Sequence, residues 1–380
     1  MNDDNSFEGL DAEHSQELVS SRLPSSNNII RGQEDSYAVG KRIASGKYGA
    51  VYEVLRTRDG KLFAAKLEVC DIATRALSMD YLVLKAANKS HLTHFCNLID
   101  RGMIQKHFKF LIMNRLGENL YKLRLQFQHY RFSAPTALRL SLEMLSALEQ
   151  LHSLGYVHRD VKPSNFALLQ SKDNNKTCRI MLIDFGLCRQ FKLPNGEIKP
   201  PRENTQFRGT IRYAPLAAHR AQEQSPKDDL ESWLYVVAEF MAGELPWSGY
   251  HGAERDEVRR IKEETRSQQG MIDLLKHCPR MEFRRILTYL DQLDYNTLPS
   301  YQYVRDLISL AIRNNDINPE EPYDWEQQNE EDEGDEDDKD EDKKEEKNGS
   351  KIVLENNKII IKQQTATPNG PSSTGPLNGK

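Results

Sequence analysis

Two short polar motifs near the middle of the sequence carry side chains suited to phosphoryl transfer. They are separated by nineteen positions, from Asn165 to Asp184, and read His158-Arg159-Asp160-Val161-Lys162-Pro163-Ser164-Asn165 and Asp184-Phe185-Gly186. Phosphoryl transfer needs a carboxylate near the acceptor hydroxyl, oxygen ligands for Mg²⁺, and a cation that neutralises the developing charge. Asp160 suits the first task, and Lys162 suits the third. Asn165 and Asp184 suit metal binding.

The plainer alternative is a chance Asp-Phe-Gly turn beside an unrelated polar loop. Either motif alone would be weak evidence. Both occur here, in order and between strand-like segments, which favours the chemical interpretation.

Two upstream segments agree with this chemistry. The first lies between strand-like runs and reads Ile43-Ala44-Ser45-Gly46-Lys47-Tyr48-Gly49-Ala50-Val51. Its small residues let backbone N–H groups approach phosphates. Lys66 follows Val51 by fifteen positions, at the end of Phe63-Ala64-Ala65-Lys66. An exposed strand lysine is the plain alternative for Lys66, and its context argues against it.

Together these four segments resemble the conserved loops of protein kinases. The resemblance implies that the cofactors are ATP and Mg²⁺, with Lys66 positioning the phosphates. It also implies that Asp160 orients the hydroxyl and accepts its proton, while Lys162 stabilises charge. Asn165 and Asp184 would hold the metal.

The sequence departs from the kinase pattern at Ala44 and Asp80, and at Leu216, where the usual Ala-Pro-Glu motif has its glutamate. Ala44 replaces the first loop glycine, although Gly46 and Gly49 remain. Asp80 stands where kinases place the helix glutamate that pairs with the strand lysine. Aspartate is one methylene shorter, so the pair must be longer or the helix must lie further inward. Glu68 is two positions from Lys66 and shares its strand face, which makes it a poor substitute.

Further segments resemble the casein kinase one superfamily, and within it the tau-tubulin kinase branch. The position of Lys162, two residues after Asp160, is the serine/threonine pattern. The superfamily segments are Phe207-Arg208-Gly209-Thr210-Ile211-Arg212-Tyr213-Ala214, Lys227-Asp228-Asp229-Leu230-Glu231-Ser232-Trp233 and Leu245-Pro246-Trp247. The segments most similar to the branch are Pro163-Ser164-Asn165-Phe166-Ala167 and Phe207-Arg208-Gly209-Thr210. The resemblance covers about residues 36–315.

The resemblance also implies where ATP would bind. Met113 would be the gatekeeper, and the backbone of Asn114 and Leu116 would form the hinge hydrogen bonds. Thr210 would contact Asp160 and Lys162, and Asp229 would brace the catalytic loop. The full set of implied ATP contacts is Ile43, Ala44, Ser45, Gly46, Gly49, Val51, Ala64, Lys66, Met113, Asn114, Leu116, Ala167 and Ile183.

The segment between Gly186 and Arg212 has no serine or tyrosine, and its only threonines are Thr205 and Thr210. We therefore expect activity without phosphorylation of this segment. Arg208 and Arg212 are candidates for an anion site that reads acidic or already phosphorylated substrates. The alternative is that both arginines only support the loop.

Apolar periodicity predicts the elements that must position these residues. Alternating runs predict strands at 37–44, 50–55, 62–69, 97–104 and 108–113, and 3.6-residue periodicity predicts a helix at 74–89. Helices are expected at about 138–151, 227–241, 254–265, 281–290 and 301–313. We predict an α+β, two-lobed protein kinase fold. A small antiparallel sheet lobe with one main helix (36–113) precedes a larger, mainly helical lobe (117–315).

The ends of the chain differ in charge from its middle. The net charge is −5, but residues 1–35 hold eight acidic and two basic residues, and residues 326–347 hold fourteen acidic residues and four lysines. Residues 348–380 add four lysines and one glutamate, a charge of +3, so residues 36–325 are basic, at +8. We expect a disordered acidic arm at 1–35 and a disordered tail at 326–380. Two apolar clusters within residues 351–362 leave open that this segment adds a strand to a partner's sheet.

Composition limits the class of protein. With 38% hydrophobic and 29% charged residues, the chain is neither wholly disordered nor fibrous, and no apolar run approaches the ~18 residues of a membrane span. Five widely spaced cysteines indicate reduced thiols, which places the protein in the cytosol, and in the nucleus as an option. We expect a monomer that binds protein substrates (acidic, phosphorylated or cytoskeletal) and neither nucleic acid nor membranes.

The sequence therefore predicts a serine/threonine protein kinase. The competing interpretation is a pseudokinase scaffold, in which Ala44 and Asp80 have weakened turnover. A tubulin-binding module is a third.

Overall fold

A computed structural model describes residues 19–70, 76–169, 179–250, 252–318, 320–326, 351–355 and 358–362. The chain divides into two compact units, Met1–Glu331 and Asp332–Lys380. In the second unit, β11 (Lys351–Glu355) and β12 (Lys358–Lys362) pair antiparallel. The expectation of disorder therefore does not hold for these ten residues, whose two apolar runs form the paired strands. The remainder of the tail beyond residue 326 lies outside the described residues.

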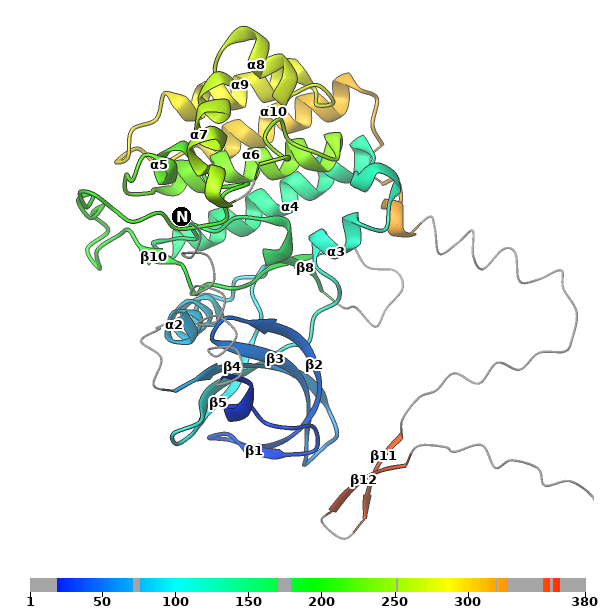
Figure 1. Cartoon of the computed structure of the whole chain (residues 1–380). Helices are drawn as coiled ribbons and strands as arrows, with labels where there is room; N and C mark the ends of the chain where they lie inside the picture. Colours follow the sequence, from blue (N-terminus) through cyan, green and yellow to red (C-terminus); the bar gives the residue numbers. More distant parts are fainter. Residues whose placement is uncertain are drawn as a thin grey trace, which may run out of the picture. The chain divides into compact units, whose positions relative to one another are not determined.

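The first unit opens with an antiparallel sheet in the order β1-β2-β3-β4-β6-β5 (Figure 1). Its strands are β1 (Ile29–Arg31), β2 (Ser36–Gly46), β3 (Gly49–Arg56), β4 (Leu62–Val69), β5 (Leu98–Ile104) and β6 (Phe108–Met113). Strand β1 corrects the expectation of a disordered arm up to residue 35. Ile30 is buried beside β2, and this strand is too short for its alternation to be visible in the sequence.

Apolar side chains that alternate along the strands form the core of the sheet, among them Tyr37, Val54 and Phe110. Strands β3 and β4 approach each other closely at Gly49. A Cβ atom on Gly49 would lie 1.8 Å from the Leu67 carbonyl oxygen, so only glycine fits there.

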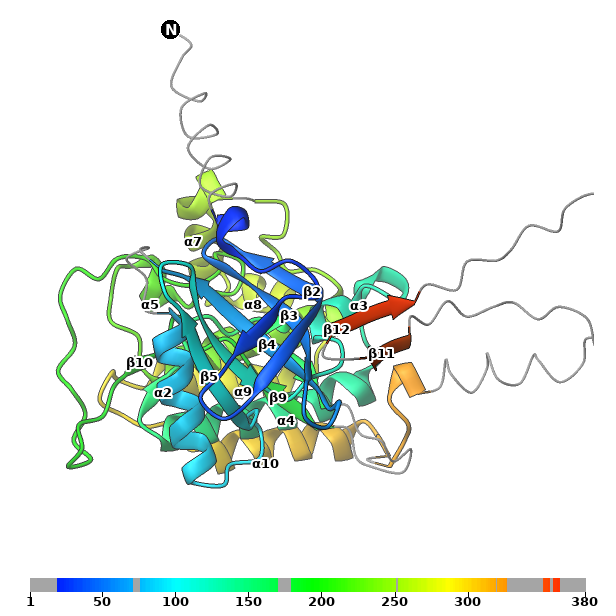
Figure 2. The ribbon, with the colours of Figure 1, turned by 90° about the horizontal axis from the view of Figure 1, so that it is seen from below.

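Helix α2 (Ala76–Lys89) covers the sheet beside β4, β5 and β6 (Figure 2). Its buried residues include Leu77, Val83 and Leu84. The Glu68 carboxylate of β4 accepts a 2.9 Å hydrogen bond from the Leu77 backbone N–H, in the first turn of the helix. This bond ties the helix to the strand that carries Lys66, because a carboxylate satisfies a donor that a helix start leaves without a helical partner.

The rest of the first unit is mainly helical. It contains α3 (Leu120–Arg124), α4 (Ala134–Ser153), α5 (Leu216–His219), α6 (Pro226–Ala242), α7 (Arg255–Glu264), α8 (Gln268–Leu274), α9 (Arg280–Asp291) and α10 (Tyr301–Asn314). The short 3₁₀ turns are η1 (Gln128–Tyr130), η2 (Pro163–Asn165) and η3 (Gly252–Glu254). Helices α4 and α6 form the centre, where the fully buried Trp233 donates to the Ser141 carbonyl at 3.0 Å. The predicted α+β, two-lobed fold is confirmed.

Two pairs of very short strands frame the polar motifs. Strand β7 (Tyr156–Val157) pairs with β10 (Arg189–Gln190), and β8 (Phe166–Leu168) pairs with β9 (Ile180–Leu182). Residues 158–165 therefore connect β7 to β8, and residues 183–188 connect β9 to β10. Periodicity did not predict these strands, since two or three residues do not establish a period.

The folded body extends past the predicted boundary at residue 315. Tyr323 is buried and stacks on Trp325, and the Asp324 carboxylate accepts bonds from Ser133 and Thr136 at the start of α4. The boundary was wrong because this segment is held by single contacts that leave no periodic pattern.

Two further observations concern composition. Among the described residues, none of the helices has both the length and the apolar character needed to cross a bilayer. Four of the five cysteines lie in the described residues, and all four are free thiols, as predicted: Cys70, Cys96, Cys188 and Cys278.

Candidate active site

Three predicted site residues contact one another: Asp160 and Lys162, which lie in the connection between β7 and β8, and Thr210, which comes from a later segment. Asp160 accepts a hydrogen bond from the Thr210 hydroxyl at 2.7 Å and pairs with Lys162 Nζ at 2.6 Å. Lys162 Nζ also lies 3.2 Å from the Thr210 oxygen. The Asp160 carboxylate is thereby held in one orientation by two donors, and Lys162 is held beside it.

Asn165 joins this loop to the second motif. Its side-chain N–H donates to the Asp160 carbonyl at 2.9 Å, which directs the amide oxygen away from that carbonyl. Its own carbonyl accepts a 2.9 Å bond from the Ile183 N–H, next to Asp184. The two motifs are therefore linked through backbone hydrogen bonds.

Arg159 and Asp184 both adopt left-handed backbone conformations, with φ of 66° and 63°. For residues other than glycine, such a conformation costs on the order of 1 kcal/mol and persists only where the surroundings enforce it. Arg159 directly precedes Asp160, and Asp184 is itself a predicted metal ligand.

Lys66 lies between two carboxylates, 2.7 Å from Asp80 Oδ2 and 2.8 Å from Asp184 Oδ1. The other Asp80 oxygen accepts a 2.8 Å bond from the Phe185 N–H. Asp80 therefore touches both the strand lysine and the Asp-Phe-Gly turn. The pair with Lys66 is not lengthened by the shorter side chain, so α2 lies close enough for aspartate to reach.

The charges in this cluster shift one another's pKa values. Lys66 lowers the pKa of Asp184 to about 2, although burial opposes this. Burial raises the pKa of Asp80 against the pull of Lys66. Burial would lower the pKa of Lys66, but its two carboxylate partners raise it instead. Lys66 is thus a cation and Asp184 an anion at neutral pH.

The buried Asp229 carboxylate on α6 braces the catalytic loop. It accepts bonds from the backbone N–H groups of His158 at 2.6 Å and Arg159 at 2.9 Å. His152 of α4 lies 2.7 Å from the same carboxylate and 2.5 Å from the Tyr301 hydroxyl. The sequence predicted the contact of Asp229 with the loop but not His152, which carries no motif signal.

The residues expected to contact ATP lie on converging elements. Ile43, Ala44, Ser45 and Gly46 end β2, and Gly49 and Val51 begin β3, with Ala44 opposite Val51. Ala64 of β4 lies opposite Met113 of β6, after which the chain crosses to the helical lobe.

In this crossing segment the Asn114 side chain accepts a 2.8 Å bond from the Asn97 N–H, and Leu116 packs against the core. Gly117 N–H donates to the Leu168 carbonyl at 2.9 Å, next to Ala167. Ile183 precedes Asp184 and also packs against the core. The crossing is thereby fastened to β8, on which Ala167 lies.

Among the described residues, Arg208 and Arg212 contact different partners. Arg212 pairs at 3.2 Å with the fully buried Glu239, which also accepts a 2.7 Å bond from the Tyr213 hydroxyl. The Arg208 side chain donates to Gln206 at 3.3 Å. Arg212 thus supports the segment that follows Thr210, as the alternative interpretation holds.

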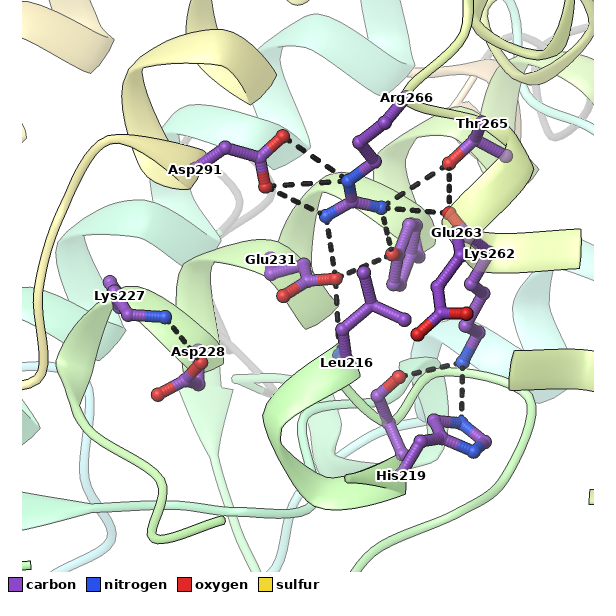
Figure 3. A network of polar contacts seen from close by, with 12 residues as sticks. Leu216, His219, Lys227, Asp228, Glu231, Lys262, Glu263, Thr265, Arg266 and Asp291 are labelled. Carbon is purple, nitrogen blue, oxygen red and sulfur yellow. Dashed lines mark hydrogen bonds and ion pairs between the residues drawn. The ribbon is translucent and has the colours of Figure 1, made fainter. Parts of the chain in front are cut away.

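A polar network anchors the end of this segment (Figure 3). Glu231 of α6 accepts a 3.2 Å bond from the Leu216 N–H and a 2.8 Å bond from Arg266, which also pairs with Asp291. Kinases usually have a glutamate at the position of Leu216. Glu231 reaches this point from another helix, so sequence reasoning missed it.

Lys262 of α7 is the second anchor. It is fully buried, and its ammonium donates to the carbonyls of Ile211 at 2.8 Å and Ala214 at 2.6 Å. His219 lies 3.3 Å from the same nitrogen (Figure 3). Nothing in the sequence distinguishes Lys262 from the other lysines and arginines of the basic body, and only its tertiary contacts reveal it.

Comparisons with known proteins agree with this geometry. Residues 37–300 match the family described as the protein kinase domain. The chain is 34% identical over 302 residues to a probable serine/threonine-protein kinase of Dictyostelium discoideum, covering 79% of this chain and 58% of that protein. It is 33% identical over 320 residues to the serine/threonine-protein kinase spe-6 of Caenorhabditis elegans, covering 83% and 82%.

A third relative, a probable casein kinase I homolog of Encephalitozoon cuniculi, is 32% identical over 289 residues, covering 75% of this chain and 91% of that protein. The match spans less than two thirds of the Dictyostelium protein but most of the other two.

Proposed function

This chain belongs to the protein kinase family, in its serine/threonine class, and from that premise we propose that it transfers the γ-phosphoryl group of ATP to serine and threonine hydroxyls of proteins. The observation that carries the proposal is the joint contact of Asp160, Lys162 and Thr210 beside the Lys66, Asp80 and Asp184 cluster.

The donor set fits the cofactors that this family uses. Mg²⁺ prefers oxygen ligands, and Asn165 and Asp184 offer an amide oxygen and an ionised carboxylate. They would hold the metal, and Lys66 would hold the phosphates. Bound Mg²⁺ and ATP would supply the phosphoryl group and neutralise charge on its oxygens.

The residues of the chain itself would align the acceptor and move its proton. Asp160 accepts the proton of the substrate hydroxyl, and its orientation is fixed beforehand by Thr210 and Lys162. Lys162 then faces the negative charge that develops during transfer. Such fixed orientation lowers the barrier because little has to reorganise in the reaction.

The Asp80 contact supports turnover over the scaffold interpretation. The 2.7 Å pair with Asp80 holds Lys66 in place. The bond from Phe185 to Asp80 also holds the metal-binding turn against α2.

Finer features are also part of the proposal. The segments quoted above favour the tau-tubulin kinase branch of the casein kinase one superfamily. The charge of residues 36–325 favours acidic, phosphorylated or cytoskeletal substrates. Because Arg212 is paired with Glu239, Arg208 is the better candidate for reading such a substrate. We place the protein in the cytosol, with the nucleus as an option, and propose that it is a monomer.

Phosphotransfer from radiolabelled Mg²⁺·ATP to casein and tubulin tests the proposal, with analysis of the labelled amino acids. We expect phosphoserine and phosphothreonine, both lost in Asp184→Asn. A folded, ATP-binding protein that transfers no phosphate would favour the scaffold. Tubulin that cosediments with an inactive variant would favour the binding module.

A further inference from the structure

A buried glutamate beneath the segment that precedes Thr210 pairs with two arginines, and the charge of a third acts on it. Glu223, in the connection from α5 to α6, is 6% exposed. Arg202 approaches both of its oxygens, with Nε 2.5 Å from Oε2 and a second nitrogen 3.2 Å from Oε1. Arg189 of β10 lies 3.2 Å from Oε2. One carboxylate thus joins two segments of the chain.

The third arginine is Arg159, the neighbour of Asp160 in the catalytic loop. Its Nε donates to the Leu187 carbonyl at 2.8 Å. Burial lowers the pKa of Arg159, while the charge of Glu223 opposes this shift. Glu223 therefore pairs directly with guanidinium groups from β10 and from the segment 187–215, while Arg159 ties the catalytic loop to the start of the same segment at Leu187.

The same connection also holds the segment through its backbone. Thr205 N–H donates to the Ala221 carbonyl at 3.0 Å, and the Thr205 hydroxyl donates to the Gln222 carbonyl at 2.9 Å. The Gln224 side chain donates to the Arg208 carbonyl at 3.4 Å. Residues 221–224 therefore form a support along which residues 202–208 lie.

Three guanidinium groups without an anion would repel one another and destabilise this support. In many kinases a phosphate added to the activation segment supplies the anion that arginines bind. The stretch between Gly186 and Arg212 contains no serine or tyrosine, and the hydroxyls of both its threonines are hydrogen-bonded, Thr205 to Gln222 and Thr210 to Asp160.

We propose that Glu223 is a built-in substitute for an activation-segment phosphate. Its carboxylate fixes residues 187–215 against the catalytic loop, so that Asp160 and Thr210 are aligned as soon as the chain folds. Glu223 is a positioning residue: it acts through Arg189 and Arg202 and touches no reacting group. This inference rests on the proposed function and names the regulation of that site.

The isosteric variant Glu223→Gln tests the role in activity. It removes the charge but keeps the shape, so kcat should fall by about tenfold or more while the Kd for ATP stays within about twofold. The matched control is Glu263→Gln, which breaks two arginine pairs, with Arg220 and Arg259, at the surface. An unchanged kcat in Glu223→Gln would overturn the inference.

Anion binding gives a readout that does not depend on phosphotransfer. Glu223→Ala removes the carboxylate between Arg189 and Arg202, so calorimetric titration with sulfate should show a site that the natural protein lacks at equal ionic strength. Sulfate or inorganic phosphate should also restore part of the lost kcat. A folded variant that neither binds sulfate nor regains activity contradicts the inference, even if the natural protein is an active kinase.

If Glu223→Ala does not fold, Arg202→Gln tests the same pair from its more exposed side, where 51% of the side chain is accessible. We expect the same loss of kcat as in Glu223→Gln. Full activity in Arg202→Gln would overturn the inference. If the natural protein transfers no phosphate, the sulfate titration alone decides, so the two proposals fail separately.

Discussion

Asp80 shows how a single departure from a motif is accommodated. A side chain one methylene shorter still pairs with Lys66 at 2.7 Å and binds the Phe185 N–H at 2.8 Å. Asp80 is only 2% exposed, so we expect a longer acid at this position to be accommodated only by displacing its neighbours. The position of α2 therefore suits an aspartate at residue 80.

We predict that Asp80→Glu, although closer to the usual kinase motif, lowers both kcat and thermal stability. The added methylene overpacks a buried site, at a cost of about 1–3 kcal/mol. Steady-state kinetics and thermal melting measure both effects, with Asp80→Asn as the variant that loses the charge. A higher kcat in Asp80→Glu would show that the aspartate is a defect.

His219 predicts a dependence of stability on pH. Burial, together with Lys262, lowers its pKa from 6.5 to about 3. Below pH 6.5 the unfolded chain binds a proton that the folded protein does not take up until about pH 3. The stabilisation is therefore complete above pH 6.5 and is lost as the pH falls toward 3.

Between pH 7.5 and 5, the Tm of the natural protein should consequently fall further than that of His219→Gln. The glutamine keeps an acceptor for Lys262 but does not titrate. If the Tm of both proteins fell by the same amount across this range, His219 would not be the source of the pH dependence.

At the scale of elements, the segment after Thr210 owes its position to contacts from α6 and α7. Lys262 holds the carbonyls of Ile211 and Ala214, and Glu231 holds the Leu216 N–H. Ile211 follows directly on Thr210, which contacts Asp160, so we expect these anchors to shape the surface that a substrate meets.

Lys262→Met retains the length of the side chain but removes its donors. Buried carbonyls that lose their partner are costly, so we expect the KM for a protein substrate to rise about fivefold or more with little change in the KM for ATP. The control is the exposed Lys276→Met. Equal changes in both KM values would indicate a general loss of structure instead.

The long elements could be predicted from the sequence because periodicity accumulates along them. The helix expected at 301–313 is α10 (Tyr301–Asn314), and the strand expected at 108–113 is β6. Short elements such as β1, β7 and α5 carry too few residues for a period. The motif residues of the site were predicted by type and spacing. Glu68, His152, Glu223, Glu231 and Lys262 were not, because each acts through a partner distant in sequence.

At the scale of the whole molecule, residues 320–326 pack against the start of α4 and complete the folded part of the first unit. Asp324 bonds to Ser133 and Thr136, and Trp325 packs against Phe132. Deleting residues 320–380 should therefore lower the Tm by at least about 5 °C, because buried contacts at the start of α4 are lost. Deleting only 327–380 should leave the Tm within about 1 °C. Equal melting temperatures for both truncations would show that this segment does not stabilise the body.

The central claim is that Asp160, oriented by Thr210 and Lys162, accepts the proton of a protein hydroxyl during phosphoryl transfer. The most direct measurement compares single-turnover phosphotransfer by the natural protein and by Asp160→Asn at saturating Mg²⁺·ATP, with ATP affinity measured in parallel. We predict a loss of at least about 10²-fold in rate with unchanged ATP affinity. An Asp160→Asn protein that transfers phosphate at the natural rate would contradict the account.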